Sequence, residues 1–512
     1  MAQEYEQYDY LTTKEVLTWQ PFNEYGFASP WAPRLWKSSA GKNYLVSGLV
    51  TLFIAATFTL VSEQCRHSCL IPLVVCGILA GVDLVAWLRK EIDIFDPKVI
   101  VAGALYLNCF LAPLMHLTYN IYGRGISTSD WPTYFGYMAC FNAVGITLYK
   151  LAQNMSFGIS RPSKTLWQLA PGTFVVILLP ALGISLVANA IIRIFFGGLV
   201  KEAGILTVIG SPHLSWLLML GDATPVLLMM AMIYWIYRRR ADSQRSLLTV
   251  VTVLIITFVF QFLWVGARGG RGATLSIVII IGAIIHYRLR PFSIKLILVG
   301  MCLAFTFAHL YNYYKMLGPR GWAAFYSAKA RESMRHELGG ATITETVLGH
   351  FARADLQAMM LSNLISNEME YRLRMGRTYR TAMLMFIPRG IWKTKPFMVK
   401  ERAGAELQGS RAEISTRAYG LAGEAMLNFG YYGIVPAFFV FGLIFGWFRK
   451  KLATMEPSDS RFFLIPILML SCVFAITSDS DVLMFGLLKR GILPFIVVFF
   501  GSIRSKFVPD YL

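Results

Sequence analysis

Residues 262–281 read FLWVGARGGRGATLSIVIII and place two arginines, Arg268 and Arg271, in a glycine-rich turn between two long apolar runs. Charges confined to short links between runs of this kind are typical of membrane-spanning helices. The whole chain has the same character, because 56% of its 512 residues are hydrophobic and its mean hydropathy is +0.53. Soluble domains are rarely so apolar. The sequence therefore predicts an all-α polytopic membrane protein.

The apolar runs predict about twelve transmembrane helices. Each holds close to the ~20 residues that a helix needs to cross a bilayer. The expected spans are 44–62, 69–88, 98–118, 132–150, 171–191, 215–237, 246–266, 273–287, 293–312, 425–447, 462–477 and 484–503. No internal sequence repeat relates these spans, so an inverted-repeat transporter gains no support from the sequence.

Loop charges predict the orientation. The chain has 48 basic and 29 acidic residues, a net charge of +19. Basic links fall on every second side, and the positive-inside rule makes that side cytoplasmic. These links are 87–98, 161–164, 237–245, 287–295, 448–451 and 504–506. Both ends of the chain are then expected in the cytoplasm.

A long loop separates the ninth and tenth expected spans. The sequence divides into a cytoplasmic segment, nine helices, a large periplasmic loop, three helices and a cytoplasmic tail, at 1–43, 44–312, 313–424, 425–503 and 504–512. Stretches 321–338 and 344–365 have apolar residues every three or four positions, which predicts amphipathic helices. We expect them to lie along the outer membrane face or to cap a cavity.

The glycine-rich turn predicts an anion site on the periplasmic side. Glycines beside Arg268 and Arg271 allow successive backbone N–H groups to point at one ligand, and the following helix adds its positive end. Guanidinium groups bind phosphate through paired hydrogen bonds. The alternative is a turn whose arginines contact lipid headgroups.

A second cationic cluster lies in the large loop at 383–397, MLMFIPRGIWKTKPF. Arg389 and Lys395 suit a phosphate group, and Trp392 could stack on a sugar. The alternative is an interfacial Trp/Lys anchor. Upstream, Arg377 belongs to a run of four arginines that either binds phosphate or forms a solvated helix face.

Polar residues near the outer ends of the spans are further candidates. Glu424 is expected in the first turn of the tenth helix, as a general base or as an acid that favours the helix dipole, with Asn428 one turn away on the same side. His350 is a weaker base candidate, and an interfacial histidine is the alternative.

Charges inside the expected spans point to function by default. Lys489 and Arg490 interrupt the twelfth helix, which we expect to occur near its outer end, close to Asp479 and Asp481. Asp222 lies in the sixth helix. A Lys/Arg–Asp pair lining a cavity fits these charges, and so does an ion pair that holds helices together.

Several function classes lack their motifs. The chain has no phosphate-binding P-loop and no G-x-S-x-G elbow, and no pair of histidines has metal-ligand spacing. The seven cysteines give no disulfide framework, and no nucleic-acid-binding motif is present. We therefore expect no metal, no cofactor and no nucleic-acid partner.

Four stretches together resemble the bacterial oligosaccharide repeat-unit polymerases, the Wzy-type O-antigen and exopolysaccharide polymerases. Residues 92–114, IDIFDPKVIVAGALYLNCFLAPL, resemble the family's "fdP" segment, and ARGGRGA at 267–273 resembles its Arg-Gly turn. FIPRGIWKTKP at 386–396 and GEAMLNFGYYG at 423–433 resemble its "iPR-x-x-W-x-x-KP" and "GE…NFG…G" segments.

The resemblance implies a GT-C-like, metal-independent membrane glycosyltransferase. Such an enzyme transfers a growing glycan from undecaprenyl pyrophosphate onto a lipid-linked repeat unit at the periplasmic face. Its partners would be lipid-linked oligosaccharides and membrane lipids, with a chain-length regulator as a further candidate. The resemblance assigns Arg268, Arg271, Arg389 and Lys395 to the pyrophosphate, and Glu424 to the acceptor hydroxyl.

Two other functions stay open at this stage. An O-antigen ligase-like enzyme would use the same donor with a lipid A-core acceptor. A flippase or transporter for lipid-linked oligosaccharides would line a path to both faces with charges, whereas the unusual charges here are expected at the outer face.

Overall fold

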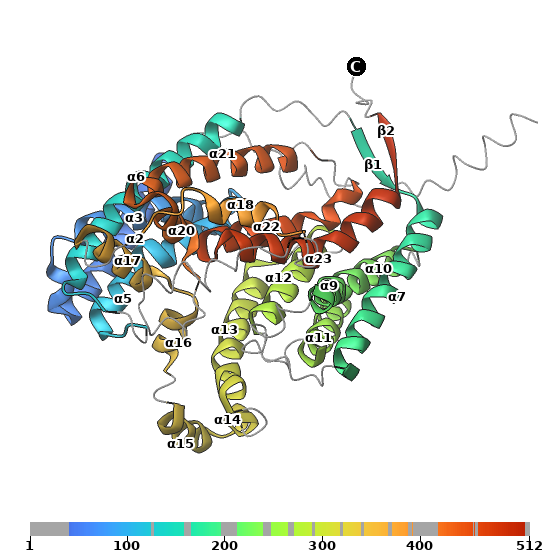
Figure 1. Ribbon diagram of the computed structural model, residues 1–512, viewed down its shortest axis with the longest axis horizontal. Helices are drawn as coiled ribbons and strands as arrows, with labels where there is room; N and C mark the ends of the chain where they lie inside the picture. The colour runs from blue at the N-terminus through green and yellow to red at the C-terminus, as the bar shows by residue number, and fades with distance from the viewer. Residues whose placement is uncertain are drawn as a thin grey trace, which may run out of the picture.

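The computed structural model describes most of the chain (Figure 1). The described residues are 40–123, 127–157, 165–195, 212–238, 247–264, 271–288, 292–317, 321–338, 342–366, 371–387, 392, 418–453, 455 and 459–506. Within them all elements are helical except two short strands. The expectation of an all-α polytopic membrane protein is confirmed at this level.

The first hydrophobic core gathers the N-terminal helices, one helix of the long loop and helices from the C-terminal part of the chain. Its main helices are α2 (Ala40–Val61), α3 (Leu70–Leu88), α4 (Pro97–Tyr106), α5 (Ala112–Tyr119), α6 (Trp131–Phe157), α17 (Ala354–Ser366), α20 (Gly420–Phe429) and α21 (Ile434–Ala453). A π-helical turn, η3 (Leu107–Leu111), joins α4 to α5, and a 3-10 turn, η2 (Glu63–Arg66), lies between α2 and α3. Helices α6 and α21 lie side by side (Figure 1).

Two glycines explain how closely α6 and α21 pack. A Cβ added at Gly442 would lie 2.5 Å from the carbonyl oxygen of Tyr149, and one at Gly446 would lie 2.5 Å from that of Gln153. Glycines spaced by four residues bring helix backbones together in membranes, where close van der Waals packing replaces the hydrophobic effect.

The "fdP" segment has a structural explanation. Asp96 caps α4, because its side chain accepts a hydrogen bond from the backbone N–H of Lys98 at 2.8 Å, and Pro97 occupies the first helical position. Both features favour the start of a helix. The same carboxylate pairs with Arg449 of α21 at 3.0 Å. The segment therefore fixes the start of one helix to the end of another.

The second hydrophobic core joins the middle helices to the last two. Its helices are α7 (Pro171–Phe195), α9 (Pro212–Gly221), α10 (Thr224–Arg238), α11 (Leu247–Trp264), α12 (Arg271–Arg288), α22 (Ile465–Thr477) and α23 (Ser480–Phe500). Because α22 also contacts α4 and α20, it connects the two cores.

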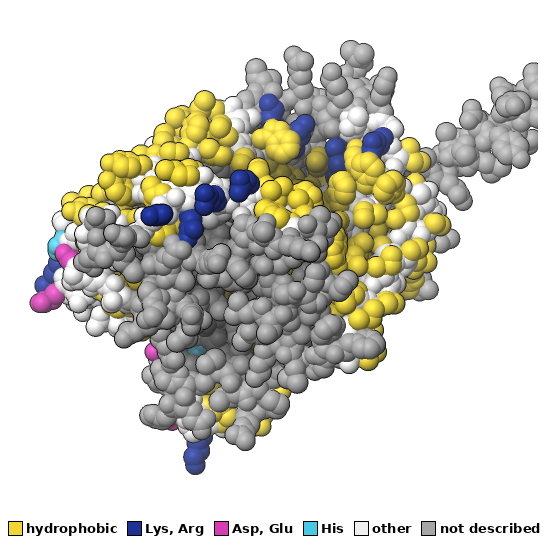
Figure 2. Space-filling view, viewed as in Figure 1, with side chains coloured by type: hydrophobic (Ala, Val, Ile, Leu, Met, Phe, Trp, Pro, Cys, Tyr) yellow, Lys and Arg dark blue, Asp and Glu magenta, His cyan; other side chains and the backbone are white. Residues whose placement is uncertain are grey.

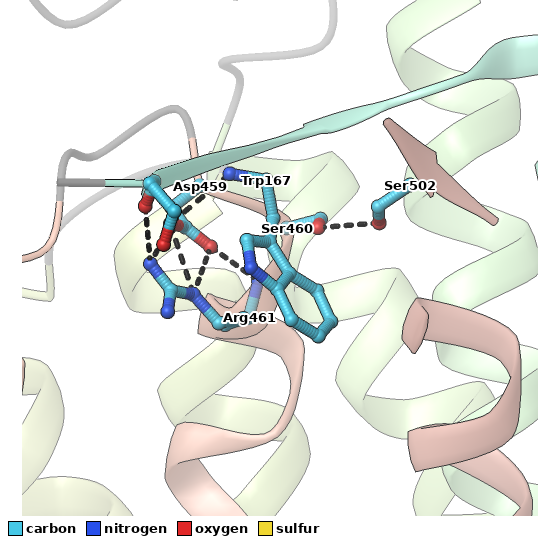
Figure 3. A network of polar contacts seen from close by, with 6 residues as sticks. Trp167, Asp459, Ser460, Arg461 and Ser502 are labelled. Atoms are coloured by element: carbon cyan, nitrogen blue, oxygen red, sulfur yellow. Dashed lines mark hydrogen bonds and ion pairs between the residues drawn. The ribbon is translucent and has the colours of Figure 1, made fainter. Parts of the chain in front are cut away.

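A two-stranded antiparallel sheet joins β1 (Thr165–Leu169) to β2 (Ser502–Lys506), with Thr165 opposite Lys506. Figure 3 shows how it is fixed to η10 (Ser460–Phe463). Asp459 pairs with Arg461 at 2.6 Å, and the hydroxyls of Ser460 and Ser502 lie 2.6 Å apart. The sheet thus ties the start of α7 to the end of α23.

The long loop contains helices of two kinds. Helix α13 (Ile294–Leu317) leads into α14 (Ala323–Tyr326) and α15 (Ala328–Leu338), which extend away from the bundle (Figure 1). The next helix, α16 (Ile343–His350), contacts α5, and its Leu348 is buried in the first core. Helix α17 (Ala354–Ser366) is different, because residues 354–362 are all buried. Its Asp355 accepts a hydrogen bond from the backbone N–H of Gly123 at 3.0 Å. Of the two expected positions, the one along the membrane surface is therefore wrong for α17, whereas capping of a cavity stays a prediction.

Eight helical segments of the described chain are long and apolar enough to cross a membrane: 40–61, 70–88, 97–119, 171–192, 216–235, 294–311, 431–452 and 480–500. Two apolar helices are shorter, Thr274–His286 and Ile465–Thr477. Hydrophobic side chains cover both flanks of the face seen in Figure 2, as contact with lipid requires. A chain that crosses a membrane several times is thus supported, whereas twelve crossings and a GT-C architecture stay predictions.

Candidate active site

Glu424 lies in the middle of α20, and only 2% of its surface is exposed. Its Oε1 accepts hydrogen bonds from the hydroxyls of Thr378 and Ser480, both at 2.6 Å. Its Oε2 accepts a hydrogen bond from the backbone N–H of Ser480 at 2.7 Å. The carboxylate therefore joins α20 to α18 (Arg377–Met383) and to the first turn of α23, through donors that are all neutral.

The expectation that Glu424 begins the tenth spanning helix is wrong. Helix α20 ends at Phe429, and the span that follows is Tyr431–Leu452, beginning with the 3-10 turn η9 (Tyr431–Gly433). Gly430 separates the two with φ 67° and ψ −169°, a conformation that is essentially restricted to glycine. Glu424 thus belongs to a separate short helix.

Asn428 lies one turn from Glu424 and contacts the same threonine. Its Nδ2 donates to Thr378 Oγ1 at 2.7 Å and to the carbonyl oxygen of Glu424 at 2.8 Å. Its Oδ1 is buried and has no hydrogen-bond partner among the described residues. Asn428 therefore holds Thr378 against the carboxylate and still has one free acceptor.

Two further carboxylates are buried beside this helix. Asp479 and Asp481 flank the start of α23, and both are fully buried. Oδ1 of Asp479 accepts the backbone N–H of Tyr419 at 2.8 Å, while its Oδ2 has no hydrogen-bond partner in the described part of the chain. The sequence signal for this site is the pair of acids in S-D-S-D at 478–481, which lies at the start of a helix.

A glycine permits this close assembly. Gly420 begins α20 with φ +73°, and a Cβ there would lie 2.4 Å from the carbonyl oxygen of Ile476. A larger residue would push the start of α20 away from the end of α22 and from Asp479.

Burial raises the pKa of the Glu424 carboxyl above its usual value, although hydrogen bonds from Ser480 and Thr378 oppose this shift. Burial also raises the pKa of Asp479, and the nearby carboxylates of Asp481 and Glu424 add to the increase. Desolvation and like charge both disfavour the ionised form. The site therefore binds protons more tightly than exposed carboxylates do, and carboxyl groups of this kind are candidates for general acid–base chemistry.

Most of the cationic residues that are expected to bind the pyrophosphate lie outside the described residues. Arg268, Arg389 and Lys395 are not among them, and Trp392 is half-buried, with its neighbours in the chain outside the described residues. Arg271 is the first residue of α12 and His350 the last of α16, and neither side chain is described.

Arg377 is placed away from the carboxylate. It begins α18 and is exposed, whereas its neighbour Thr378 is buried and contacts Glu424. The local backbone explains this, because Gly376 adopts φ 78° just before the helix and sets which residue points inward.

Arg490 lies at the centre of α23, whereas Glu424 contacts the start of that helix. The expectation that Lys489 and Arg490 lie near the end of their helix is wrong, because α23 begins at Ser480 and both residues occur at its centre. Lys489 Nζ pairs with Asp222 Oδ2 at 2.8 Å, and Asp222 lies in the turn between α9 and α10 rather than within a helix. Asp222, Lys489 and Arg490 are termed the mid-membrane charge cluster below.

Among the described residues, no group of three or more His, Cys, Asp or Glu side chains is placed to hold a metal ion. A metal-independent reaction stays a prediction. Comparison with known proteins gives no family assignment: no protein-family model, curated protein or solved structure matches this chain.

Proposed function

We propose that this protein is a membrane glycosyltransferase that polymerises lipid-linked oligosaccharides. It would transfer a glycan from undecaprenyl pyrophosphate onto a lipid-linked repeat unit at the periplasmic face of a bacterial inner membrane. The products would be O-antigen, exopolysaccharide or capsule chains.

The buried carboxylate of Glu424 is the observation that supports this proposal most. It lies in the stretch that resembles the family's "GE…NFG…G" segment, and its partners are two hydroxyls and one backbone N–H rather than a cation. A structural carboxylate is usually neutralised by Lys or Arg when it is buried. A carboxylate with neutral donors and a raised pKa is suited to accept a proton.

The reaction needs a base and a group that stabilises the leaving diphosphate. As the bond between the donor sugar and the diphosphate breaks, the acceptor oxygen bonds to the same carbon and its proton passes to Glu424. An acceptor hydroxyl would replace the hydroxyl of Thr378 or Ser480 at the carboxylate. Arg268, Arg271, Arg389 and Lys395 would stabilise the charge on the diphosphate.

A flippase or transporter is the second candidate, and one observation favours it. The mid-membrane charge cluster lies at the centre of α23 and beside a broken helix, which is where transporters place substrate and ion sites. An O-antigen ligase-like enzyme remains the nearest alternative by chemistry, since it would use the same donor.

The experiment is a lipid-linked glycan profile of a deletion strain that carries wild-type, Glu424→Gln or Arg389→Ala protein at equal levels in the membrane. Loss of a general base typically lowers the rate by about 10²–10⁴-fold. We expect both variants to lose long chains and to accumulate single repeat units at the periplasmic face. Exposed Glu332→Gln on α15 is the control, and it should keep the wild-type profile.

The other outcomes separate the rival functions. Long polymer that stays on the carrier lipid in the deletion strain would indicate a ligase, and repeat units trapped on the cytoplasmic face would indicate a flippase. Long chains from Glu424→Gln protein at the wild-type level would exclude Glu424 as the base.

A further inference from the structure

Arg490 is a buried cation that has no hydrogen-bonded partner in the described chain. Only 6% of its surface is exposed, and its nearest aromatic contact places Cζ 5.8 Å from the ring centroid of Phe474. A guanidinium carries five N–H donors in a fixed plane. Burying it without an acceptor costs free energy, and a bound anion would relieve that cost.

The mid-membrane charge cluster also has more positive than negative charge. Asp222 is paired with Lys489 at 2.8 Å, so its single carboxylate faces two cations. Helix α10 begins at Thr224, two residues after Asp222, and its N-terminus adds a partial positive charge. The net positive charge of the cluster therefore favours the binding of an anion.

Polar side chains of α7 stabilise the break in the helix beside the cluster. Asn189 Nδ2 donates to the carbonyl oxygen of Gly221 at 2.7 Å and to Thr224 Oγ1 at 2.8 Å. Ser185 Oγ donates to the carbonyl oxygen of Leu220 at 2.6 Å. Irregular backbone at membrane depth is tolerated where it is buried in protein or lines a cavity. Specific hydrogen bonds therefore stabilise the break between α9 and α10, and the break places Asp222 against α23.

The cluster is far from both ends of its helix. Ten residues of α23 precede Arg490 and ten follow it, which at about 1.5 Å per residue is roughly 15 Å in each direction. Glu424 contacts Ser480 at the start of the same helix. The two polar regions are thus separate places along α23.

We propose that the mid-membrane charge cluster binds a diphosphate group, with Arg490 donating paired hydrogen bonds and Lys489 exchanging Asp222 for the ligand. The identification of the ligand as the diphosphate of a polyprenyl carrier lipid rests on the proposed function. The preference for an anion rests on the excess of positive charge and on a guanidinium that donates no hydrogen bond within the described chain, although Asp222 faces it.

Binding can be tested on the purified full chain with geranylgeranyl diphosphate as the probe. Calorimetry should give a lower affinity for Arg490→Gln by about tenfold, the effect of losing one charge-assisted hydrogen bond. Asp222→Asn should instead raise the affinity, because it frees Lys489 and removes a competing negative charge. Arg66→Gln, which removes an exposed cation outside the candidate spans, is the control and should leave the affinity unchanged.

Unfolding without ligand separates a binding role from a structural one. Because Arg490 donates no hydrogen bond within the described chain, Arg490→Gln should leave the unfolding temperature unchanged or raise it. A lower unfolding temperature together with unchanged probe affinity would mean a structural cation and would overturn the proposal. The absence of probe binding by the wild-type protein would overturn it as well.

The source of the diphosphate is decided by competition. Failure of excess inorganic pyrophosphate to displace the bound geranylgeranyl diphosphate would support a carrier lipid, and displacement at comparable concentration would support a free anion. If wild-type protein binds the probe in this way but makes no polymer, the binding site is supported and the polymerase proposal is overturned.

Discussion

At the scale of single residues, Asp479 is the side chain whose chemistry is most unusual. It is fully buried, one of its oxygens has no hydrogen-bond partner in the described chain, and its pKa is raised by burial and by Asp481 and Glu424. A carboxyl group of this kind keeps its proton in the folded state at a pH where the unfolded chain has released it. Stability is then linked to pH at this residue.

The sign of this linkage gives a prediction. The stabilisation is complete below the ordinary pKa of 3.8 and is lost as the pH rises toward the raised pKa of the folded state. Between these values the free energy of unfolding falls by up to about 1.4 kcal/mol per pH unit. Asp479→Asn imitates the protonated form, so its unfolding temperature should vary less than that of the wild type between pH 5 and 8.

The control for this measurement is Glu332→Gln, which changes an exposed carboxylate on α15 and should keep the wild-type slope. A slope in Asp479→Asn as steep as in the wild type would show that other groups cause the pH dependence.

At the scale of elements, apolar runs in the sequence predicted where helices occur but not where they break. Nothing in the local pattern at 425–447 distinguishes a continuous helix from α20 and α21 separated at Gly430, because the break is a choice of backbone angles at one glycine. The same holds at Asp222, where side chains of α7 stabilise the break. The sequence also did not predict that α17 is buried. An amphipathic pattern does not show whether other segments of the protein cover the polar side of the helix.

The contact between α6 and α21 gives a prediction at this scale. In Gly446→Ala the new Cβ would lie 2.5 Å from Gln153 O and 2.8 Å from Ser156 Cβ, so the two helices must move apart. Overpacking of this kind costs about 1–3 kcal/mol. Gly300→Ala in α13 is the matched control, because nothing lies within 4 Å of its added Cβ.

Thermal unfolding in detergent compares the two variants. Gly446→Ala should unfold at a lower temperature than the wild type, whereas Gly300→Ala should not, since alanine favours helix by about 1 kcal/mol over glycine. Equal unfolding temperatures would mean that α6 and α21 adjust without cost.

At the scale of the whole molecule, the sequence predicted a helical protein that crosses a membrane several times, with eight of the twelve expected spans long and apolar enough in the structure, but it predicted long-range pairing poorly. Asp83 has a lysine seven residues away at position 90, but it pairs with Lys150 on α6 at 2.6 Å. Lys489 likewise pairs with Asp222 on a distant segment. Such pairs are decided by which helices become neighbours, and a single sequence contains no local signal for that.

Orientation in the membrane is the prediction that belongs to this scale. If basic links face the cytoplasm, a cysteine introduced at exposed Ser68 should react with an impermeant maleimide from the periplasm. A cysteine at exposed Lys451 should react only after the inner membrane is permeabilised. Wild-type protein gives the background from its seven native cysteines. The reverse pattern would place the candidate active site on the cytoplasmic side.

The burial of α17 has a consequence for engineering. Its Gln357 donates to the carbonyl oxygen of Tyr419 at 2.8 Å, and its Ser362 accepts a hydrogen bond from Thr128 at 2.9 Å. A chimera that replaces the whole loop with that of another protein would replace part of the interior as well. Grafts limited to α14 and α15 would leave these interior contacts intact and are the better starting point.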